Sequence, residues 1–280
     1  MWWYNIVTER KKIMKKLLFT LMPLALVLSS CNGASTIDEA KAKEIAKAVE
    51  TESLKVKGVE LTTTSKTTTK NGDSTVTVEN ESFIRFNANG EGYYKNVSET
   101  EGTTELYHVF DETYEEVYCY YTTKGEEKTY EVNVKKDNEL AFGIAQIAYS
   151  LTEILYKMPY SVYSMPYSTF FAAGDATDAE EEEEDKNYDT VVTYSSSGEK
   201  NLTIDAKRTL KEGASENPTG AEAAKEMHIT AKYDDLHLVE LVIDQVSTLG
   251  NTSYSKTTVT IKDDVTITLP EGWEDHIQKQ

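Results

Sequence analysis

The sequence predicts a mainly β protein with helices (α+β), in which an antiparallel sheet packs on one or two helices. Apolar residues recur with a period of two along much of the chain, and turn residues separate these stretches. Residues 138–157 instead carry apolar residues at helical spacing. The alternation indicates that one face of the sheet meets solvent, because strands buried on both faces would be apolar throughout.

Residues 59–134 contain the first set of predicted strands. Ile84 and Phe86 share one strand face, and Val132 and Val134 share another. The turns between the strands are expected at Asn71-Gly72-Asp73, Asn89-Gly90, Glu101-Gly102 and Lys124-Gly125. The short spacing of strands and turns predicts an antiparallel meander.

A helix is predicted before these strands, ending at about residue 52. Thr36 and Glu39 match a capping box, and Asp38 suits the first turn. Ile45 and Val49 belong to a narrow apolar stripe, and the other positions alternate Lys with Glu. This pattern is typical of a surface helix laid against a sheet.

The middle of the chain is its most apolar part. In the predicted central helix, residues 138–157, apolar side chains lie on nearly every side, so more than one side must be covered. An apolar loop, residues 158–171, follows and contains two prolines. Residues 172–187 include five consecutive glutamates, whose mutual repulsion predicts a disordered acidic loop.

The second half returns to alternating strands. Apolar alternation predicts strands near residues 191–194, 202–204, 227–233, 239–243, 254–261 and 265–269. The turns joining them are expected at Ser197-Gly198, Asp234-Asp235 and Asp263-Asp264. Since neither half has a convincing core of its own, residues 53–280 are predicted to form a single antiparallel-sheet domain.

The first thirty residues have the pattern of a secretory leader. A basic cluster, from Arg10 to Lys16, precedes twelve mostly apolar residues ending at Leu28. A helix of that length spans about 18 Å, which is too short for a bilayer core of about 30 Å. The alternative, a buried core helix, fits the basic flank poorly. Met14 is also a natural start for such a leader, so translation from either Met1 or Met14 stays open.

The end of the leader resembles the lipobox of bacterial lipoproteins. Leu28, Ser29 and Ser30 precede Cys31, as a leucine and two small residues precede the modified cysteine in that family. The resemblance implies that residues 1–30 are a removed signal peptide and that Cys31 carries a diacylglyceryl anchor. Residues 31–52 would then form a lipid-anchored tether and the N-terminal helix, at the extracytoplasmic face of the cell membrane.

The order of elements, sheet then apolar helix then sheet, resembles the periplasmic lipoprotein carriers of the LolA and LppX type. Those proteins wrap a curved antiparallel sheet, or half-barrel, around helices and leave an apolar cavity between them. The resemblance therefore implies a curved sheet with a cavity. The glutamate-rich loop and the tyrosine content of this chain depart from that pattern.

Composition argues against several functions. The net charge of -19 disfavours nucleic-acid binding, because phosphates would be repelled. No catalytic serine motif, phosphate-binding glycine loop or paired metal ligands occur, so we expect no enzyme, no cofactor and no metal site. Cys119 is interpreted as a small apolar strand residue, with a reactive or intermolecular thiol as the alternative.

Two functions remain open. Thirteen of the 18 tyrosines lie between Tyr93 and Tyr167, beside the apolar helix, and tyrosine suits both strand packing and ligand cavities. The first hypothesis is a lipoprotein that holds a lipid or other apolar ligand between sheet and helix. The candidate ligand-binding residues are Phe142, Ile147, Leu151, Ile154, Tyr118 and Tyr120. The second is a surface interaction or adhesion lipoprotein without a cavity, which binds a protein partner through residues 158–171.

Overall fold

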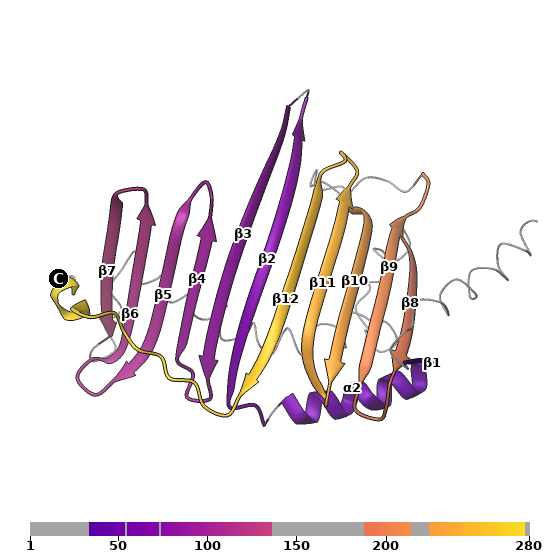
Figure 1. Ribbon diagram of the computed structural model, residues 1–280, viewed down its shortest axis with the longest axis horizontal. Coiled ribbons are helices and arrows are strands. Elements are labelled where there is room, and N and C mark those ends of the chain that lie inside the picture. The colour runs from indigo at the N-terminus through magenta and orange to yellow at the C-terminus, as the bar shows by residue number, and fades with distance from the viewer. Residues whose placement is uncertain (1–33, 54, 73, 136–187, 214–223, 278–280) are drawn as a thin grey trace, which may run out of the picture.

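In the computed structural model, the described residues are 34–53, 55–72, 74–135, 188–213 and 224–277, and their strands form one twelve-stranded antiparallel sheet (Figure 1). The first half provides β1 (Ser35–Ile37), β2 (Gly58–Asn71), β3 (Ser74–Asn87), β4 (Gly92–Ser98), β5 (Gly102–Asp111), β6 (Glu115–Lys124) and β7 (Glu127–Lys135). The second half provides β8 (Tyr188–Ser196), β9 (Leu202–Leu210), β10 (Ala224–Asp234), β11 (His237–Ser247) and β12 (Thr252–Lys262). The prediction of a large antiparallel sheet is confirmed.

The sheet joins two meanders side by side. Its strand order is β1-β8-β9-β10-β11-β12-β2-β3-β4-β5-β6-β7, so β12 pairs with β2 at the centre. The turns predicted in the first half separate β2 from β3, β3 from β4, β4 from β5 and β6 from β7. Gly72, Gly90, Gly102 and Gly125 all have positive φ angles there, which explains why glycine stands at these turns.

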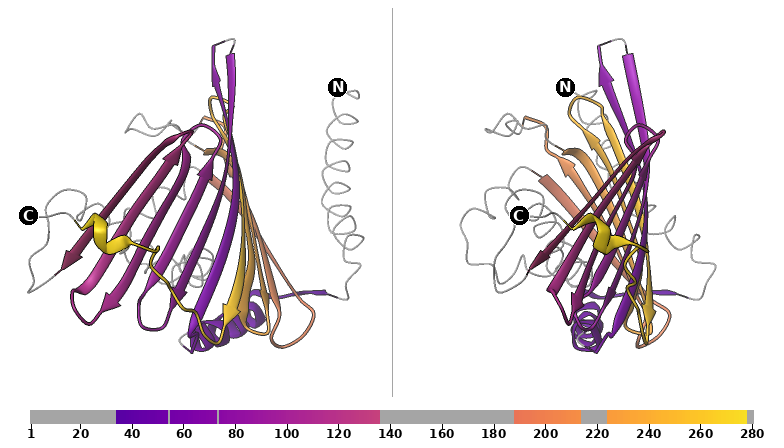
Figure 2. Two further views of the ribbon diagram at one scale, coloured as in Figure 1. Left: turned by 60° about the vertical axis from the view of Figure 1, so that its left-hand side comes forward. Right: turned by 90° about the vertical axis from the view of Figure 1, so that its left-hand side faces the viewer.

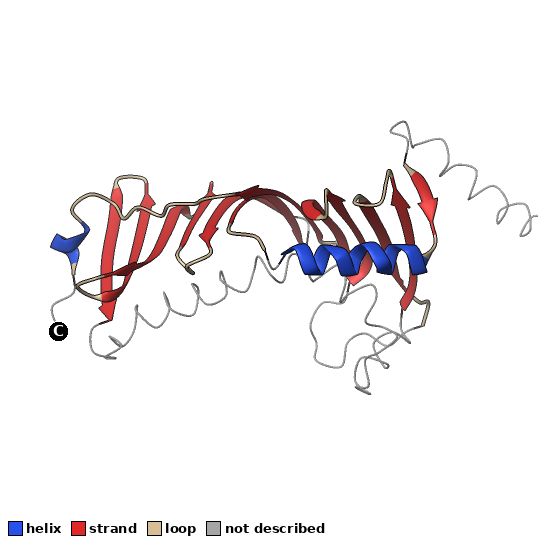
Figure 3. Cartoon of the chain, turned by 90° about the horizontal axis from the view of Figure 1, so that it is seen from below, coloured by secondary structure: helices blue, strands red, loops and turns tan. Residues whose placement is uncertain are grey.

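An α-helix near the start of the described residues packs on the concave face of the sheet. Helix α2 (Glu39–Ser53) lies against β8, β9 and β11, and Figure 3 shows it beneath one half of the arched sheet. We call this concave side the inner face. Ala42, Ile45, Ala46 and Val49 of α2 are buried against it. The predicted apolar stripe is thus the buried side of the helix.

The N-cap residue of the helix lies two positions after the predicted one. The Asp38 carboxylate accepts a hydrogen bond from the Lys41 backbone amide at 2.8 Å, so Asp38 is the N-cap residue. Thr36 instead belongs to β1 and pairs with Ser195 of β8. The capping box predicted for Thr36 and Glu39 is therefore wrong, because β1 holds Thr36 in an extended strand.

The opposite, outer face carries rows of charged side chains. Glu240 on β11 contacts Lys232 on β10 at 2.5 Å and Lys256 on β12 at 2.7 Å. Glu60 on β2 likewise lies 2.8 Å from Arg85 and 3.2 Å from Lys262. These cross-strand pairs are typical of a solvated sheet face. These charged pairs therefore lie on the outer face, as the alternation predicts, whereas the buried core that includes α2 lies on the inner face.

Residues 263–277 form a strap over part of the outer face. The sequence predicts a strand over 265–269, but no strand forms there, and the chain crosses the sheet toward β7 (Figures 1 and 2). Val265, Ile267 and Leu269 pack with residues of β5, β6 and β7. The strap ends in the short 3-10 helix η2 (Trp273–His276) and a parallel bridge between Ile277 and Val132.

Several predicted segments lie outside the described residues. These are the signal peptide 1–30, Cys31, the central helix 138–157, the apolar loop 158–171 and the acidic loop 172–187. Among the helices that the structure does describe, none combines the length and the apolar character needed to cross a bilayer.

Candidate functional site

The inner face of the central and tyrosine-rich strands carries one continuous row of apolar side chains. Direct cross-strand pairing places these six residues next to one another, from β12 to β6. We call them the apolar row: Val259, Leu61, Ile84, Tyr94, Leu106 and Tyr120. On the edge strand β7 the row ends at Glu131, which pairs with Tyr120.

The apolar row is shielded from water. Leu61 and Leu106 are each 1% exposed and Ile84 is 2% exposed, whereas Tyr94 and Tyr120 are half-buried. Burying an aliphatic side chain of this size contributes about 1.5–3 kcal/mol. The row lies on β12 and β2–β6, while α2 lies against β8, β9 and β11. The apolar row and the helix therefore occupy different halves of the inner face.

Two of the predicted ligand-binding residues lie on this face. Tyr120 belongs to the apolar row, and Tyr118 lies one pair further along β6, with only 3% of its surface exposed. The other four, Phe142, Ile147, Leu151 and Ile154, lie outside the described residues. The ligand-binding role of all six stays a prediction.

The even spacing of Tyr114, Tyr118 and Tyr120 predicts one shared strand face, but Tyr114 lies on the other side of the sheet. Glu115, the residue after it and the first of β6, has φ 64°, which interrupts the alternation at the start of the strand. The Tyr114 ring instead packs edge-on against Trp273 of the strap, with ring centroids 5.8 Å apart. The prediction fails because a residue with left-handed backbone angles breaks the regular alternation, so side chains before and after it do not keep to the same face.

A buried histidine lies beside the apolar row, at a position where the sequence by itself predicts only a strand or surface residue. His108 on β5 is 3% exposed, stacks on the Tyr118 ring at 4.5 Å, and has its Nε2 3.5 Å from Glu116 Oε2. The Tyr118 hydroxyl donates to the same carboxylate. Burial lowers the pKa of His108, although Glu116 acts in the opposite direction. Leu106 lies two residues before His108 on β5. Because strand side chains alternate between faces, this apolar neighbour indicates that His108 also points to the inner face.

The remaining tyrosines of this region serve the outer face. The Tyr93 and Tyr107 hydroxyls both donate to Glu105 Oε2, at 3.0 and 2.6 Å. Burial, reinforced by Glu105, raises the pKa of Tyr93 to about 12 and also raises that of Tyr107. The described tyrosines of the cluster, from Tyr93 to Tyr130, are therefore divided between the two faces of the sheet.

Cys119 is buried beneath the strap. Its side chain is fully covered and packs with Val117, Val132 and Ile267. Burial raises the pKa of the thiol to about 12, against a smaller opposite effect of the Tyr130 hydroxyl. These surroundings favour the interpretation of Cys119 as a structural residue, since the thiolate is the reactive form.

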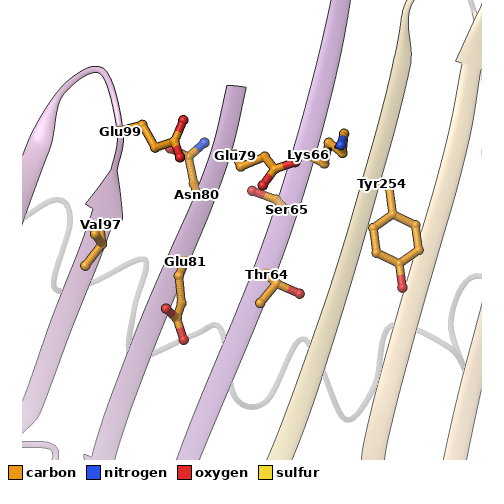
Figure 4. Close-up of a pocket in the computed structure, with 9 residues that line it drawn as sticks. All are labelled: Thr64, Ser65, Lys66, Glu79, Asn80, Glu81, Val97, Glu99 and Tyr254. Atoms are coloured by element: carbon orange, nitrogen blue, oxygen red, sulfur yellow. Dashed lines mark ion pairs between the residues drawn. The ribbon is translucent and has the colours of Figure 1, made fainter. Parts of the chain in front are cut away.

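A shallow groove of about 400 Å³ lies away from the apolar row, about halfway along the long β2–β3 hairpin (Figure 4). Its lining includes the Lys66–Glu79 ion pair, with Nζ and Oε1 2.7 Å apart, together with Val97 and Tyr254. By strand alternation these four side chains belong to the outer face. These four side chains therefore lie on the face opposite to the apolar row.

Within the described ranges, no three His, Cys, Asp or Glu side chains gather as metal ligands. The nearest arrangement to a catalytic group is on the outer face, where Asp205 Oδ2 lies 2.8 Å from His228 Nε2. Thr230 donates its hydroxyl to the same carboxylate oxygen at 3.1 Å. Because the hydroxyl faces the carboxylate and not the imidazole, the geometry does not prepare a nucleophile.

Comparisons with known proteins give only distant structural similarity. No family model and no curated protein matches the chain. Among solved structures, LprF from Mycobacterium bovis is 12% identical with a TM-score of 0.38, and the match covers 84% of this chain and 99% of that one.

Two further solved structures are similar to the chain. A putative outer membrane lipoprotein-sorting protein domain from Vibrio parahaemolyticus is 8% identical, with a TM-score of 0.25 and coverage of 82% and 95%. A LolA superfamily protein from Nitrosomonas europaea is also 8% identical, with a TM-score of 0.23 and coverage of 85% and 97%. Since these TM-scores are low, the function is inferred from the residues of this chain.

Proposed function

We propose that the protein is a membrane-anchored extracytoplasmic lipoprotein that holds the acyl part of a lipid on the inner face of its sheet. The observation that carries the proposal is the apolar row, which runs without a polar interruption across six neighbouring strands of a concave surface. Binding would be hydrophobic, with few fixed polar contacts.

The length of the apolar row suits an acyl chain. Neighbouring strands lie about 4.8 Å apart, so six strands span about 24 Å. One leaflet of a bilayer has a hydrocarbon depth of about 15 Å, half of the bilayer core. A chain of ordinary length therefore fits along the row. Because the row is already shielded from water, the ligand would replace existing apolar contacts there.

The anchor would place the sheet close to a membrane. Cys31 precedes the first residue of β1, Ser35, by four positions, and four residues reach at most about 14 Å. If Cys31 is acylated, the edge of the sheet formed by β1 and β8 therefore lies near the bilayer surface. Lipid could then pass between membrane and sheet over a short distance.

The lipid proposal is tested with matched variants on one strand. Tyr120→Gln makes the apolar row polar, whereas Tyr121→Gln changes the neighbouring half-buried tyrosine on the outer face. We expect the first to reduce uptake of a fluorescent fatty acid several-fold and the second to leave it unchanged. The proposal would be refuted by equal uptake in the wild type and both variants, together with no lipid in solvent extracts of the wild-type protein analysed by mass spectrometry.

The anchor is tested separately in cells. Radiolabelled palmitate should be incorporated into the full chain, and Cys31→Ala should abolish the label and release the protein from the membrane fraction. A labelled Cys31→Ala protein would show that the acyl chain is attached elsewhere.

A further inference from the structure

The apolar row has a sharp boundary on one side. The next row of cross-strand neighbours on the inner face, toward the β2–β3 hairpin tip, consists entirely of uncharged polar residues. We call it the hydroxyl row: Thr257, Thr63, Ser82, Asn96, Thr104 and Thr122. The following row of inner-face neighbours toward the hairpin tip is also polar and uncharged, and it contains Ser255, Ser65, Asn80 and Ser98.

Much of the hydrogen-bonding capacity in the hydroxyl row is not used by contacts among the described residues. Thr63 and Thr257 bond to each other, with their Oγ1 atoms 2.8 Å apart. The other four side chains lie on β3, β4, β5 and β6, are half-buried, and make no side-chain hydrogen bond within the described part of the chain. Half-buried hydroxyl and amide groups gain free energy when a partner satisfies them. The row therefore offers adjacent donors and acceptors to a ligand.

The absence of charge in this row contrasts with the outer face of the same strands. Glu81, Lys95, Glu105 and Lys256 are outer-face residues directly next to the hydroxyl-row positions of β3, β4, β5 and β12. A chain with 28% charged residues thus has none in the hydroxyl row. A phosphate-bearing ligand held beside an apolar surface needs a cation to offset its desolvation, and the hydroxyl row has none.

We propose that the ligand is an amphiphile with an uncharged, hydroxyl-bearing head group, an acylated polyol without phosphate. This inference rests on the proposed function and adds the head-group class and the orientation. The acyl chain lies on the apolar row, and the head group lies on the hydroxyl row, directed toward the tip of the β2–β3 hairpin. Four neighbouring strands supply its hydrogen bonds.

The test compares two lipids that differ by one phosphate. Monooleoylglycerol and monooleoylglycerol phosphate share their acyl chain and glycerol, and each competes with a fluorescent fatty acid for the purified protein. We expect the uncharged lipid to compete at a concentration at least tenfold lower. Equal competition, or stronger competition by the phosphate, overturns the head-group assignment while leaving acyl binding intact. Failure of both lipids and of the fluorescent fatty acid to bind overturns the proposed function as well.

A charge-adding variant provides an independent test. Thr104→Lys places a cation in the hydroxyl row, and Thr103→Lys adds the same charge to the outer face of the same strand. We expect Thr104→Lys to shift the preference toward the phosphate lipid and Thr103→Lys to leave it unchanged. An identical shift in both variants would mean that net charge, and not the hydroxyl row, sets the preference. The wild-type comparison stands even if Thr104→Lys does not fold.

Discussion

At the scale of single residues, His108 shows how the inner face fixes a titratable group in its uncharged form. The ring is stacked on Tyr118 and faces Glu116, with Glu91 also nearby, yet burial dominates and lowers its pKa. The unfolded chain binds a proton at His108 below a pH of about 6.5. The folded protein binds that proton only at lower pH, so its stability rises with pH through this window.

The lowered pKa of His108 predicts that replacing this residue makes the protein's stability less sensitive to acid. The free energy of unfolding contributed by His108 is fully present above the unfolded pKa and decreases as the pH falls below it. In His108→Gln, urea unfolding should therefore lose less stability between pH 7 and pH 5 than in the wild type. His228→Gln, on the outer face, is the matched control. An unchanged or steeper pH dependence in His108→Gln would contradict the buried, neutral state.

Cys119 gives a second prediction at the residue scale. Because the thiol is fully covered and its pKa is raised to about 12, very little thiolate forms at neutral pH. In a chain with Cys31→Ser, iodoacetamide should label Cys119 slowly in buffer and rapidly in urea, as measured by mass spectrometry. Rapid labelling of the folded protein would show that Cys119 is a reactive thiol.

At the scale of elements, the strap explains both the burial of Cys119 and a failure of sequence reasoning. Val265, Ile267 and Leu269 alternate like a strand because every second side chain faces the outer surface of the sheet. Alternation alone cannot distinguish a hydrogen-bonded strand from an extended segment lying across one. The hairpins β8–β9 and β10–β11 were predictable because turn residues separate their apolar runs.

Removing the strap should expose the surface beneath it. A chain ending at Lys262 lacks Val265, Ile267 and Trp273, which pack with Val117 and Cys119. We expect such a chain, also carrying Cys31→Ser, to react with iodoacetamide at Cys119 without urea and to unfold at lower urea concentration. Circular dichroism should still show β structure. Continued protection of Cys119 would mean that the sheet covers it without the strap.

At the scale of the whole molecule, the sequence indicates the two faces but not their lateral pattern. Alternation predicts that Leu61 and Ile84 face the same side of their own strands, yet their position as direct neighbours depends on the pairing of β2 with β3. The pairing of β12 with β2, between segments almost two hundred residues apart, has no local signal. The apolar and hydroxyl rows therefore become visible only when the registers of six strands are combined.

The most direct measurement is photo-cross-linking with a monooleoylglycerol that carries a diazirine at the end of its acyl chain. After irradiation, peptide mapping identifies the strands that contact the chain. The account predicts labels on inner-face residues of β2 to β6, such as Leu61, Ile84 and Leu106. Labels confined to the strap or to the groove lined by Val97 and Tyr254, or no label at all, would contradict it.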